Sequence, residues 1–449
     1  MNKLPRGFSL RDNTLWFRGI DILRLVNAHQ SPLRINFPEL LIENYTFLTK
    51  TVQEVLKSQE LSENKFLCGY AIKANQNYDL VVNAAKHTSF LEVSSKNDLD
   101  IIEQVKTELG SKMIICHGFK PASTSYFKKI VAMHKKGFTI IPVINSVTEL
   151  YDFGSLDLKM SIGVRISAKV SFGGSKLPDR FGLTLHEIQQ HFAYLTQHKT
   201  LSLTMLHMHV ANTISDIPQR IQDFDDLFTV YEMMIKAEMK INYICTGGGL
   251  PERSYTPDYF YTEYYQKLIF RINQLTTAEY FPILLSESGR FLATETQFVV
   301  LKVIAEKNSN DDFSWYVLNG SAINLIPETV LDGNKHFPIL PVNFIDRPSK
   351  TVICSGATCD QADFFHTQKI NLPQIDKNDS LFVTIPGTGA YQESLLGSSR
   401  NTPGHCLIEA TNELTITASG ICSRTTKNDF LQTLGYTKQK SFFKWLFSR

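Results

Sequence analysis

Eight short apolar runs alternate with segments of helical spacing between residues 66 and 287, and this alternation limits the possible folds more than any other feature. The runs are FLCGYAI (66–72), SFLEV (89–93), KMIICH (112–117), FTIIPVI (138–144), KMSIGVRI (159–166), LSLTMLHMHV (201–210), INYICT (241–246) and FPILLSE (281–287). Helical patterns lie between them, for example at 97–109, 124–136 and 224–240. The pattern predicts an α/β fold in which parallel strands, buried on both faces, close into a (β/α)8 barrel over 33–295. An open doubly wound sheet is the alternative.

The pattern changes after residue 295. Strand-like segments separated by Pro, Gly, Asn and Asp follow: TQFVVLKVIAEK (296–307), FSWYVLNG (313–320), KTVICSG (350–356), SLFVTIPG (380–387) and ELTITASG (413–420). They predict an antiparallel β domain over 296–449. The N-terminal segment 1–32, which contains TLWFRGIDI (14–22), is expected to add a strand to it.

Composition excludes several classes of protein. The net charge is +2, from 46 Lys and Arg against 44 Asp and Glu, so no nucleic-acid partner is expected. Seven cysteines without a CxxC pair predict reduced thiols in a cytoplasmic protein and no metal site. No stretch resembles a signal peptide or a membrane span, and KSFFKWLFSR at the C-terminus is expected to pack on its own domain or on a partner chain.

Polar side chains end nearly every run, at the barrel end where functional sites form. They are Lys73, Glu92, Ser94, His117, Asn145, Arg165, His207, His209, the TGGGL segment (246–250) and SESGR (286–290). Burial at a strand end is expected to lower the pKa of Lys73. The glycine triplet and Arg290 follow strands seven and eight, where barrels bind phosphate.

A lysine, a phosphate cradle and the carboxylate of Glu287 are together what pyridoxal phosphate needs. Taken singly, each has a structural explanation: a strand-end lysine, a tight glycine turn, and a surface ion pair between Glu287 and Arg290.

Ordered motifs from about Pro38 to Cys422 resemble the fold-type-III, alanine-racemase-like decarboxylases of ornithine, arginine and diaminopimelate, which depend on pyridoxal phosphate. The motifs are YAIKAN (70–75), LEVSSKNDL (91–99), VRIS (164–167), DRFGL (179–183), LHMHVAN (206–212), TGGGL (246–250), ESGR (287–290), SGATCDQAD (355–363) and GTGAYQ (387–392).

The resemblance implies a role for each matching residue. Lys73 carries the cofactor as an imine, His209 stacks on its ring, and Glu287 faces the ring nitrogen. Cys359 protonates the product. The remaining cofactor contacts are Glu92, Asp98, Arg165, Asn212, Gly247, Gly248, Gly249, Gly289, Arg290 and Tyr391, and the substrate contacts are Asp360, Asp363 and, after a small shift in alignment, Asp332.

The chain departs from the family pattern at three positions. Asn212 replaces a serine that contacts phosphate, Ser288 replaces a proline, and Cys245 replaces the aspartate before the glycine triplet. These departures suggest an outlying branch of the family, acting on a modified or carrier-bound amino acid.

The implied activity is decarboxylation of an amino acid, or a derivative, with a distal cationic group of the lysine, ornithine or arginine kind, as in polyamine biosynthesis. A carboxylate at the ring nitrogen keeps it protonated and favours the quinonoid left when CO2 departs, whereas racemases use arginine there. An amino-acid racemase or epimerase and a cofactor-dead regulatory homologue are the alternatives. LIPETV (325–330) lacks the arginine of diaminopimelate enzymes, which disfavours that substrate. The resemblance also implies a homodimer whose sites combine Lys73 of one chain with Cys359 and Asp360 of the other.

Overall fold

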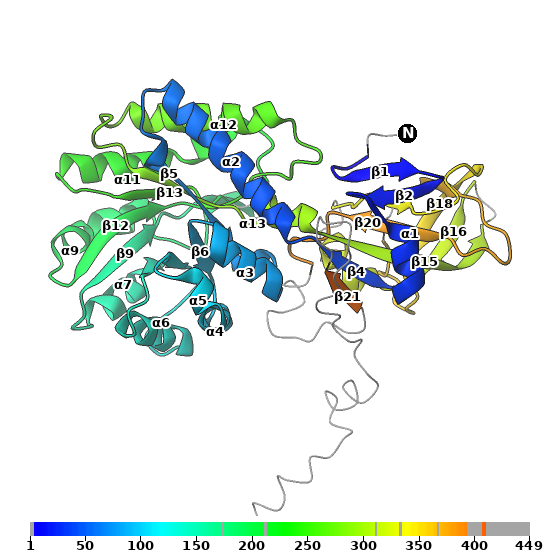
Figure 1. Ribbon diagram of the computed structural model, residues 1–449. Coiled ribbons are helices and arrows are strands. Elements are labelled where there is room, and N and C mark those ends of the chain that lie inside the picture. The colour runs from blue at the N-terminus through cyan, green and yellow to red at the C-terminus, as the bar shows by residue number, and fades with distance from the viewer. Residues whose placement is uncertain are drawn as a thin grey trace, which may run out of the picture. The chain divides into compact units, whose positions relative to one another are not determined.

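The computed structural model of the 449-residue chain describes residues 4–172, 175–210, 213–309, 312–331, 335–365, 368–392 and 406–409 (Figure 1). For 170–172, 175–176 and 406–409 it describes the main chain alone. Asn212, Asp332, ELTITASG (413–420) and KSFFKWLFSR (440–449) lie outside the described residues. The described chain divides into two compact units, one made of 38–296 and 389–392, the other of 4–37, 297–388 and 406–409. The unit boundaries therefore fall at 37/38 and 296/297, rather than at 32/33 and 295/296.

The larger unit is a closed parallel barrel, so the barrel prediction is confirmed and the open sheet is excluded. Its strands are β5 (Phe66–Ala71), β6 (Phe90–Val93), β7 (Met113–Cys116), β8 (Ile140–Ile144), β9 (Met160–Arg165), β12 (Leu201–His207), β13 (Tyr243–Cys245) and β14 (Ile283–Glu287). Each lies within one of the eight apolar runs. Pairing of β14 with β5 closes the ring, so all eight C-terminal ends meet at one mouth.

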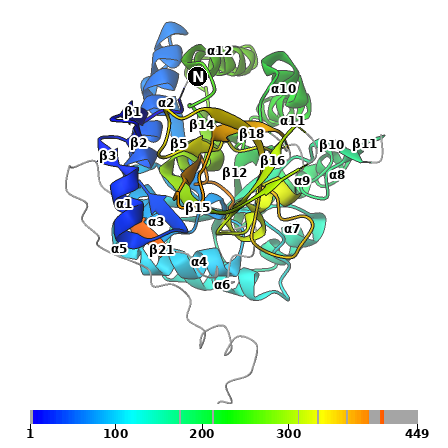
Figure 2. The same ribbon diagram turned by 90° about the vertical axis from the view of Figure 1, so that its right-hand side faces the viewer.

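One helix, α2, precedes the first barrel strand, and the other helices follow the strands; together they surround the barrel (Figure 2). They are α2 (Glu39–Ser58), α3 (Tyr78–His87), α4 (Lys96–Gln104), α5 (Lys106–Leu109), α6 (Ser125–Lys135), α7 (Val147–Gly154), α8 (Leu185–Gln190), α9 (Phe192–Gln197), α10 (Ile217–Asp223), α11 (Asp225–Lys236), α12 (Asp258–Asn273) and α13 (Gly289–Ala293). Ser95, Thr124, Ser146 and Thr184 cap α4, α6, α7 and α8 by accepting a backbone N–H bond three residues on. Such caps satisfy donors that the first helical turn leaves open. A hairpin of β10 (Lys169–Phe172) and β11 (Ser175–Pro178), which the sequence did not predict, follows β9.

The smaller unit is built on a sheet in the order β17–β20–β15–β16–β18–β19. Its members are β15 (Gln297–Asn308), β16 (Ser314–Leu318), β17 (Leu340–Pro341), β18 (Ser349–Ser355), β19 (Ile370–Pro373) and β20 (Phe382–Pro386), with α14 (Ala322–Leu325) and α15 (Pro327–Leu331) between strands. Most neighbours are antiparallel, as predicted, but β16 and β18 run parallel because a long connection separates them.

The N-terminal contribution to this unit comes from β4 (Leu33–Asn36), which pairs with β15 and, in parallel, with β21 (Cys406–Glu409). TLWFRGIDI does not join that sheet. It forms β2 (Thr14–Phe17) and β3 (Ile20–Asp21) of a small sheet with β1 (Phe8–Arg11), followed by α1 (Ile22–His29). An N-terminal strand therefore joins this unit, as expected, but it is Leu33–Asn36, so its placement within 1–32 is wrong.

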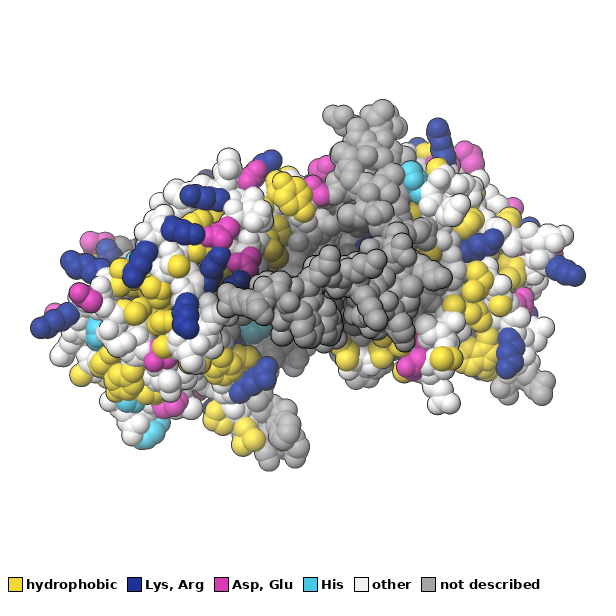
Figure 3. Space-filling view, turned by 90° about the horizontal axis from the view of Figure 1, so that it is seen from below, with side chains coloured by type: hydrophobic (Ala, Val, Ile, Leu, Met, Phe, Trp, Pro, Cys, Tyr) yellow, Lys and Arg dark blue, Asp and Glu magenta, His cyan; other side chains and the backbone are white. Residues whose placement is uncertain are grey.

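The face in Figure 3 carries Lys and Arg side chains interspersed with Asp and Glu. On α4, on α6 and directly after α6, Lys96, Lys129 and Lys136 alternate with Asp100 and Glu103 in ion pairs of 2.5–3.0 Å. Such exposed pairs contribute little to stability, about 0–1 kcal/mol each. Among the described residues, none of the helices has both the length and the apolar character needed to cross a membrane.

The barrel interior beneath the mouth is filled by a separate apolar cluster that includes Phe90, Ile115, Val143, Met205 and Leu285. Phe90 is fully buried and lies beside Gly69 of the neighbouring strand. A Cβ atom at Gly69 would lie only 2.2 Å from the Phe90 ring. The ring therefore occupies the space that the glycine leaves.

We expect Gly69→Ala to destabilise the barrel by about 1–3 kcal/mol, the usual cost of overpacking a core. The measurement is the midpoint of chemical unfolding of the purified protein. Gly69→Ala combined with Phe90→Leu is the control, since the smaller side chain makes room for the new methyl group. In the Phe90→Leu protein, Gly69→Ala should lower the unfolding midpoint less than it does in the unmodified protein. An equal loss in both proteins would contradict this packing account.

Candidate active site in the barrel mouth

Lys73 lies in a short 3-10 turn (Ile72–Ala74) directly after β5, and 43% of its side chain is exposed. Its Nζ atom is 3.1 Å from Oε2 of Glu92, a fully buried carboxylate at the end of β6. Ser94 donates its hydroxyl to the other oxygen of Glu92 at 2.6 Å. The two neighbouring strands thus hold an amine against a carboxylate.

Burial acts to lower the pKa of Lys73, but the charge of Glu92, followed by Tyr391 and Glu287, more than offsets it and raises this pKa above its ordinary value. The expectation that burial would make Lys73 easier to deprotonate is therefore wrong. The sequence indicated the buried strand end, but not the carboxylate that faces the ammonium group.

Glu287 ends β14 inside the mouth and is 5% exposed. His117, from the end of β7, places Nε2 at 2.6 Å from Oε1 of Glu287, and His207 of β12 places Nε2 at 3.4 Å from Oε2. Burial acts to raise the pKa of Glu287, but His117 and then His207 outweigh it and hold this pKa well below its usual range. Burial, with His117 next, lowers the pKa of His207 to about 3.

The glycine triplet after β13 lets the main chain approach closely. Gly247 and Gly249 have φ angles of 66° and 101°, which favour glycine. A Cβ at Gly247 would lie 2.4 Å from Nδ1 of His209, and one at Gly248 would lie 2.7 Å from the carbonyl oxygen of Glu287. The Gly248 N–H donates to Nδ1 of His209 at 3.2 Å, which fixes the imidazole orientation.

Arg165 ends β9 and is 8% exposed. Its guanidinium group is 3.3 Å from Asp179 and lies over the ring of Phe181, both from the DRFGL loop. Asp98, at the start of α4, accepts bonds from the Ser94 N–H at 2.9 Å and from Gln76 at 2.6 Å. The second-strand motif thus supplies two buried carboxylates.

The chain returns to the barrel at 389–392, after β20. Asn75 donates its amide to the Gly389 carbonyl at 2.9 Å, and the Tyr391 N–H donates to the Ala74 carbonyl at 2.6 Å. The guanidinium group of Arg290 lies 4.9 Å from the centre of the Tyr391 ring. Tyr391 therefore stands beside Lys73 and the first turn of α13, where Gly289 lies.

Cys359 and Asp360 lie in the other unit and are both exposed. Asp363 is 3% exposed and accepts bonds from the Thr358 hydroxyl at 2.6 Å, the Ser321 hydroxyl at 3.1 Å and the Ala322 N–H at 2.7 Å. This carboxylate orders the loop that carries Cys359 and Asp360.

Two of the residues that depart from the family motif, Ser288 and Cys245, are buried. The Ser288 N–H donates to the Gly69 carbonyl at 3.0 Å, a bond that a proline would lack. Cys245 is buried, and burial and the charge of Glu287 raise the pKa of its thiol well above the ordinary value.

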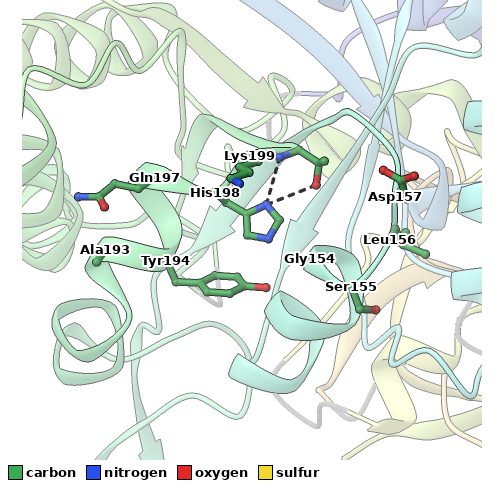
Figure 4. Close-up of a pocket in the computed structure, with 10 residues that line it drawn as sticks. Gly154, Ser155, Leu156, Asp157, Ala193, Tyr194, Gln197, His198 and Lys199 are labelled. Atoms are coloured by element: carbon green, nitrogen blue, oxygen red, sulfur yellow. Dashed lines mark hydrogen bonds between the residues drawn. The ribbon is translucent and has the colours of Figure 1, made fainter.

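A hollow of about 620 Å³ lies at the opposite end of the barrel, where β9 and β12 begin (Figure 4). Its central imidazole, His198, accepts backbone N–H bonds from Thr200 at 3.3 Å and Leu201 at 3.1 Å through Nδ1. These bonds give His198 a structural role at the start of a strand, away from the mouth.

The mouth thus brings together Lys73, Glu92, Asp98, Arg165, His209, Gly247, Gly248, Gly249, Glu287, Gly289, Arg290 and Tyr391, whereas Asn212 and Asp332 lie outside the described residues. Sequence reasoning named His117 and His207 as strand ends but gave them no role. Their contact with Glu287 depends on the barrel order, which places β7 and β14 apart on the ring.

Residues 49–294 match the family model described as the pyridoxal-binding domain of the pyridoxal-dependent decarboxylases. The match covers more than half of the chain, which therefore belongs to this family, and its cofactor is pyridoxal phosphate.

Named relatives act on two substrates. The chain is 24% identical over 303 residues to the biosynthetic arginine decarboxylase of Shewanella halifaxensis, covering 61% of this chain and 46% of the relative. It is 20% identical over 414 residues to the diaminopimelate decarboxylase of Aquifex aeolicus, covering 89% and 91%. The chain thus spans about half the length of the arginine decarboxylase.

Solved structures show the same fold. Diaminopimelate decarboxylase from M. jannaschii in complex with L-lysine has a TM-score of 0.78 at 18% identity, covering 96% of this chain and 98% of that one. The biosynthetic arginine decarboxylase of Campylobacter jejuni has a TM-score of 0.79 at 18% identity, covering 96% and 91%.

The mouth fits this cofactor on its own geometry. An amine stands at the end of β5, and glycines that cannot accept a Cβ without a clash line one side. Buried polar atoms without a partner among the described residues include Nε of Arg165 and Nδ1 of His207. A polar, charged ligand would satisfy such atoms.

We expect Glu92→Gln to lower the pKa of Lys73, because it removes the nearest negative charge. Covalent attachment of added pyridoxal phosphate needs the neutral amine. The rate of attachment to Glu92→Gln should therefore reach half its maximum at a pH at least about one unit lower than in the unmodified protein. Borohydride trapping followed by mass measurement across pH reads this midpoint. Glu103→Gln, which removes a carboxylate paired with Lys129 and Lys136 on the barrel exterior, should keep the original midpoint. Equal midpoints for both variants would refute the role of Glu92.

Proposed function

We propose that this protein decarboxylates an amino acid or amino-acid derivative with a distal cationic group. The observation that carries the proposal is the buried, ionised Glu287 in the mouth that also holds Lys73. Bound pyridoxal phosphate supplies an electron sink for the electron pair that remains when CO2 leaves. The Glu287 carboxylate maintains a proton at the ring nitrogen and so favours loss of CO2 over racemisation.

The other residues of the mouth bind the cofactor and orient it. Lys73 would anchor the cofactor covalently, and His209, oriented by the Gly248 N–H, would lie against its ring. Gly247, Gly249 and Gly289 offer backbone N–H groups to the phosphate, and Arg290 and Tyr391 add side-chain contacts. Glu92 and Arg165 hold the cofactor from the second and fifth strands, and Asn212 is proposed as a further contact.

The product needs a proton at its α-carbon, and we assign its delivery to the Cys359 thiol. Asp360 pairs with the distal cation of the substrate, and Asp332 is a further candidate for this contact. Asp363 shapes the loop that presents Cys359 and Asp360. Arginine and diaminopimelate are the substrates named for the relatives, and both carry a distal cationic group.

We further propose a homodimer in which the Cys359 loop of each chain completes the site of its partner. The exposure of Cys359 and Asp360 on the β unit supports this arrangement. The free thiols of Cys68, Cys116, Cys245, Cys354 and Cys359 support a reducing compartment such as the cytoplasm.

The purified protein is expected to show the absorption band of the attached cofactor and to release CO2 from at least one candidate substrate. The screen covers L- and D-lysine, ornithine, arginine, diaminopimelate and their conjugates. Lys73→Ala should abolish both signals. Lys96→Ala, at a lysine with the same exposed fraction of 43%, is the matched control and should retain both. Racemisation without CO2 would establish the racemase instead, and a bound cofactor without turnover on any candidate would contradict the proposal.

Glu287→Gln should keep the cofactor bound and slow CO2 release strongly, at least about tenfold, because a neutral amide stabilises the protonated ring nitrogen less. Cofactor content by absorbance and CO2 release by a coupled assay are the two measurements. An unchanged rate would refute the ring-nitrogen role.

Mixing Lys73→Ala with Cys359→Ala subunits should restore partial activity, because hybrid dimers regain one intact site. Subunit exchange is verified by mass measurement of the mixed species. Absence of recovery despite exchange would exclude the shared site.

A further inference from the structure

The shortest polar contact of Glu287 is made by a histidine to which the proposed function gives no task. His117 is 4% exposed, and its Nε2 atom lies 2.6 Å from Oε1 of Glu287. The two residues come from β7 and β14, which are not neighbours in the barrel. The hydrogen bond therefore spans the barrel interior.

The backbone that delivers His117 is held from several sides. Its N–H donates to the Val93 carbonyl at 2.8 Å. The carbonyl of Gly118, the next residue, accepts from Nζ of Lys120 at 3.0 Å and from the Asn145 amide at 2.9 Å. Gly118 itself has a φ angle of 74°, and a Cβ there would lie 2.5 Å from the Ser94 carbonyl oxygen.

Lys120 is fully buried and is held in turn by Glu149, whose oxygen lies 3.1 Å from Nζ. Removing one partner of a buried ion pair is strongly destabilising, because the other charge is left buried without a partner. The backbone of His117 and the turn that follows it are therefore held by contacts that do not involve Glu287.

The hydrogen bond at 2.6 Å needs one proton between the two atoms. Burial alone favours the neutral carboxyl, yet His117 and His207 hold the pKa of Glu287 well below its usual range. Glu287 is therefore the acceptor and the Nε2–H of His117 is the donor. Oε1 is committed to this bond, whereas the contact from Nε2 of His207 to Oε2 is longer, at 3.4 Å.

Other charged or titratable groups also face Glu287. They are Cys245 of β13, Arg165 of β9, Lys73 after β5, and His209 after β12. The Cys245 thiol stays protonated because burial and the charge of Glu287 raise its pKa. His117 differs from these groups because it makes the short hydrogen bond.

We propose that His117 is a positioning residue that holds the Glu287 carboxylate ionised and fixed through Oε1, leaving Oε2 to serve the ring nitrogen of the cofactor. The inference rests on the proposed function of Glu287 and adds the group that maintains its charge. His117 acts through Glu287 and is given no contact with the substrate.

The test compares His117→Phe, His117→Asn and His117→Gln as holoenzymes without substrate. Phenylalanine keeps the ring but has no donor, and asparagine is too short to reach. The Nε2 of glutamine lies the same number of bonds from Cα as the Nε2 of histidine. Once the donor is removed, burial raises the pKa of Glu287. In an acid titration, Glu287 of the variant therefore takes up its proton at a higher pH than Glu287 of the unmodified protein. The acid limb of the bound-cofactor absorbance should move to higher pH by at least about one unit in His117→Phe and His117→Asn, a tenfold change in proton affinity.

His117→Gln keeps the donated hydrogen bond but lacks the coulombic attraction that His117 exerts on Glu287, so its acid limb should move less than in His117→Phe and His117→Asn. This partial rescue separates donation of a hydrogen bond from simple packing. His134→Phe is the control for loss of an imidazole, since Nε2 of His134 bonds the Lys159 carbonyl away from the mouth. Thermal unfolding and cofactor affinity are measured alongside. If His117→Phe does not fold, the shift of the acid limb in His117→Asn decides the test.

An acid limb that does not move in His117→Asn, or that moves equally in His117→Gln, would overturn the inference. Because the absorbance is read without substrate, it remains decisive if no amino acid releases CO2. Failure of the proposed function is thereby distinguished from failure of the His117 assignment.

Discussion

The site depends on one constraint: the carboxylate of Glu287 must stay ionised although the residue is only 5% exposed. Burying an unpaired charge costs several kcal/mol, so Glu287 remains ionised only with partners of its own. Those partners, His117 and His207, come from β7 and β12, while Glu287 ends β14. These three strands meet only because parallel strands close into a ring with their C-terminal ends together. Closure of the barrel therefore brings the partners of Glu287 together and so allows its charge to remain buried.

Close approach of backbone is the second requirement of the mouth. Gly247 and Gly248 stand where a Cβ would collide with His209 or with the Glu287 main chain, and the Gly248 N–H orients His209. The Ser288 N–H bonds the Gly69 carbonyl, beside the seam where β14 meets β5. A serine in place of proline thus adds a hydrogen bond at the point of closure and removes a rigid ring. The departure from the family motif is consistent with an intact mouth.

The sequence predicted the barrel because eight buried runs alternate with helices, and it predicted which residues stand at the mouth because strand ends converge. It did not predict which of these residues touch. His117 and Glu287 lie 170 positions apart, and their bond depends on the width and order of the barrel. The strand contributed by the N-terminal segment was placed too early, since TLWFRGIDI and LRIN both have strand character. Leu33–Asn36 is identified as the strand that joins the sheet only by its pairing with β15 in the structure.

The largest error concerned Lys73, and its cause is instructive. Desolvation was inferred from the apolar run before the lysine, yet the next strand contributes Glu92, whose carboxylate meets the ammonium group at 3.1 Å. An opposite charge at this distance favours the charged form more strongly than partial burial disfavours it. Glu92 thus holds Lys73 as a cation, so the charge that faces this amine, rather than its burial, determines its protonation.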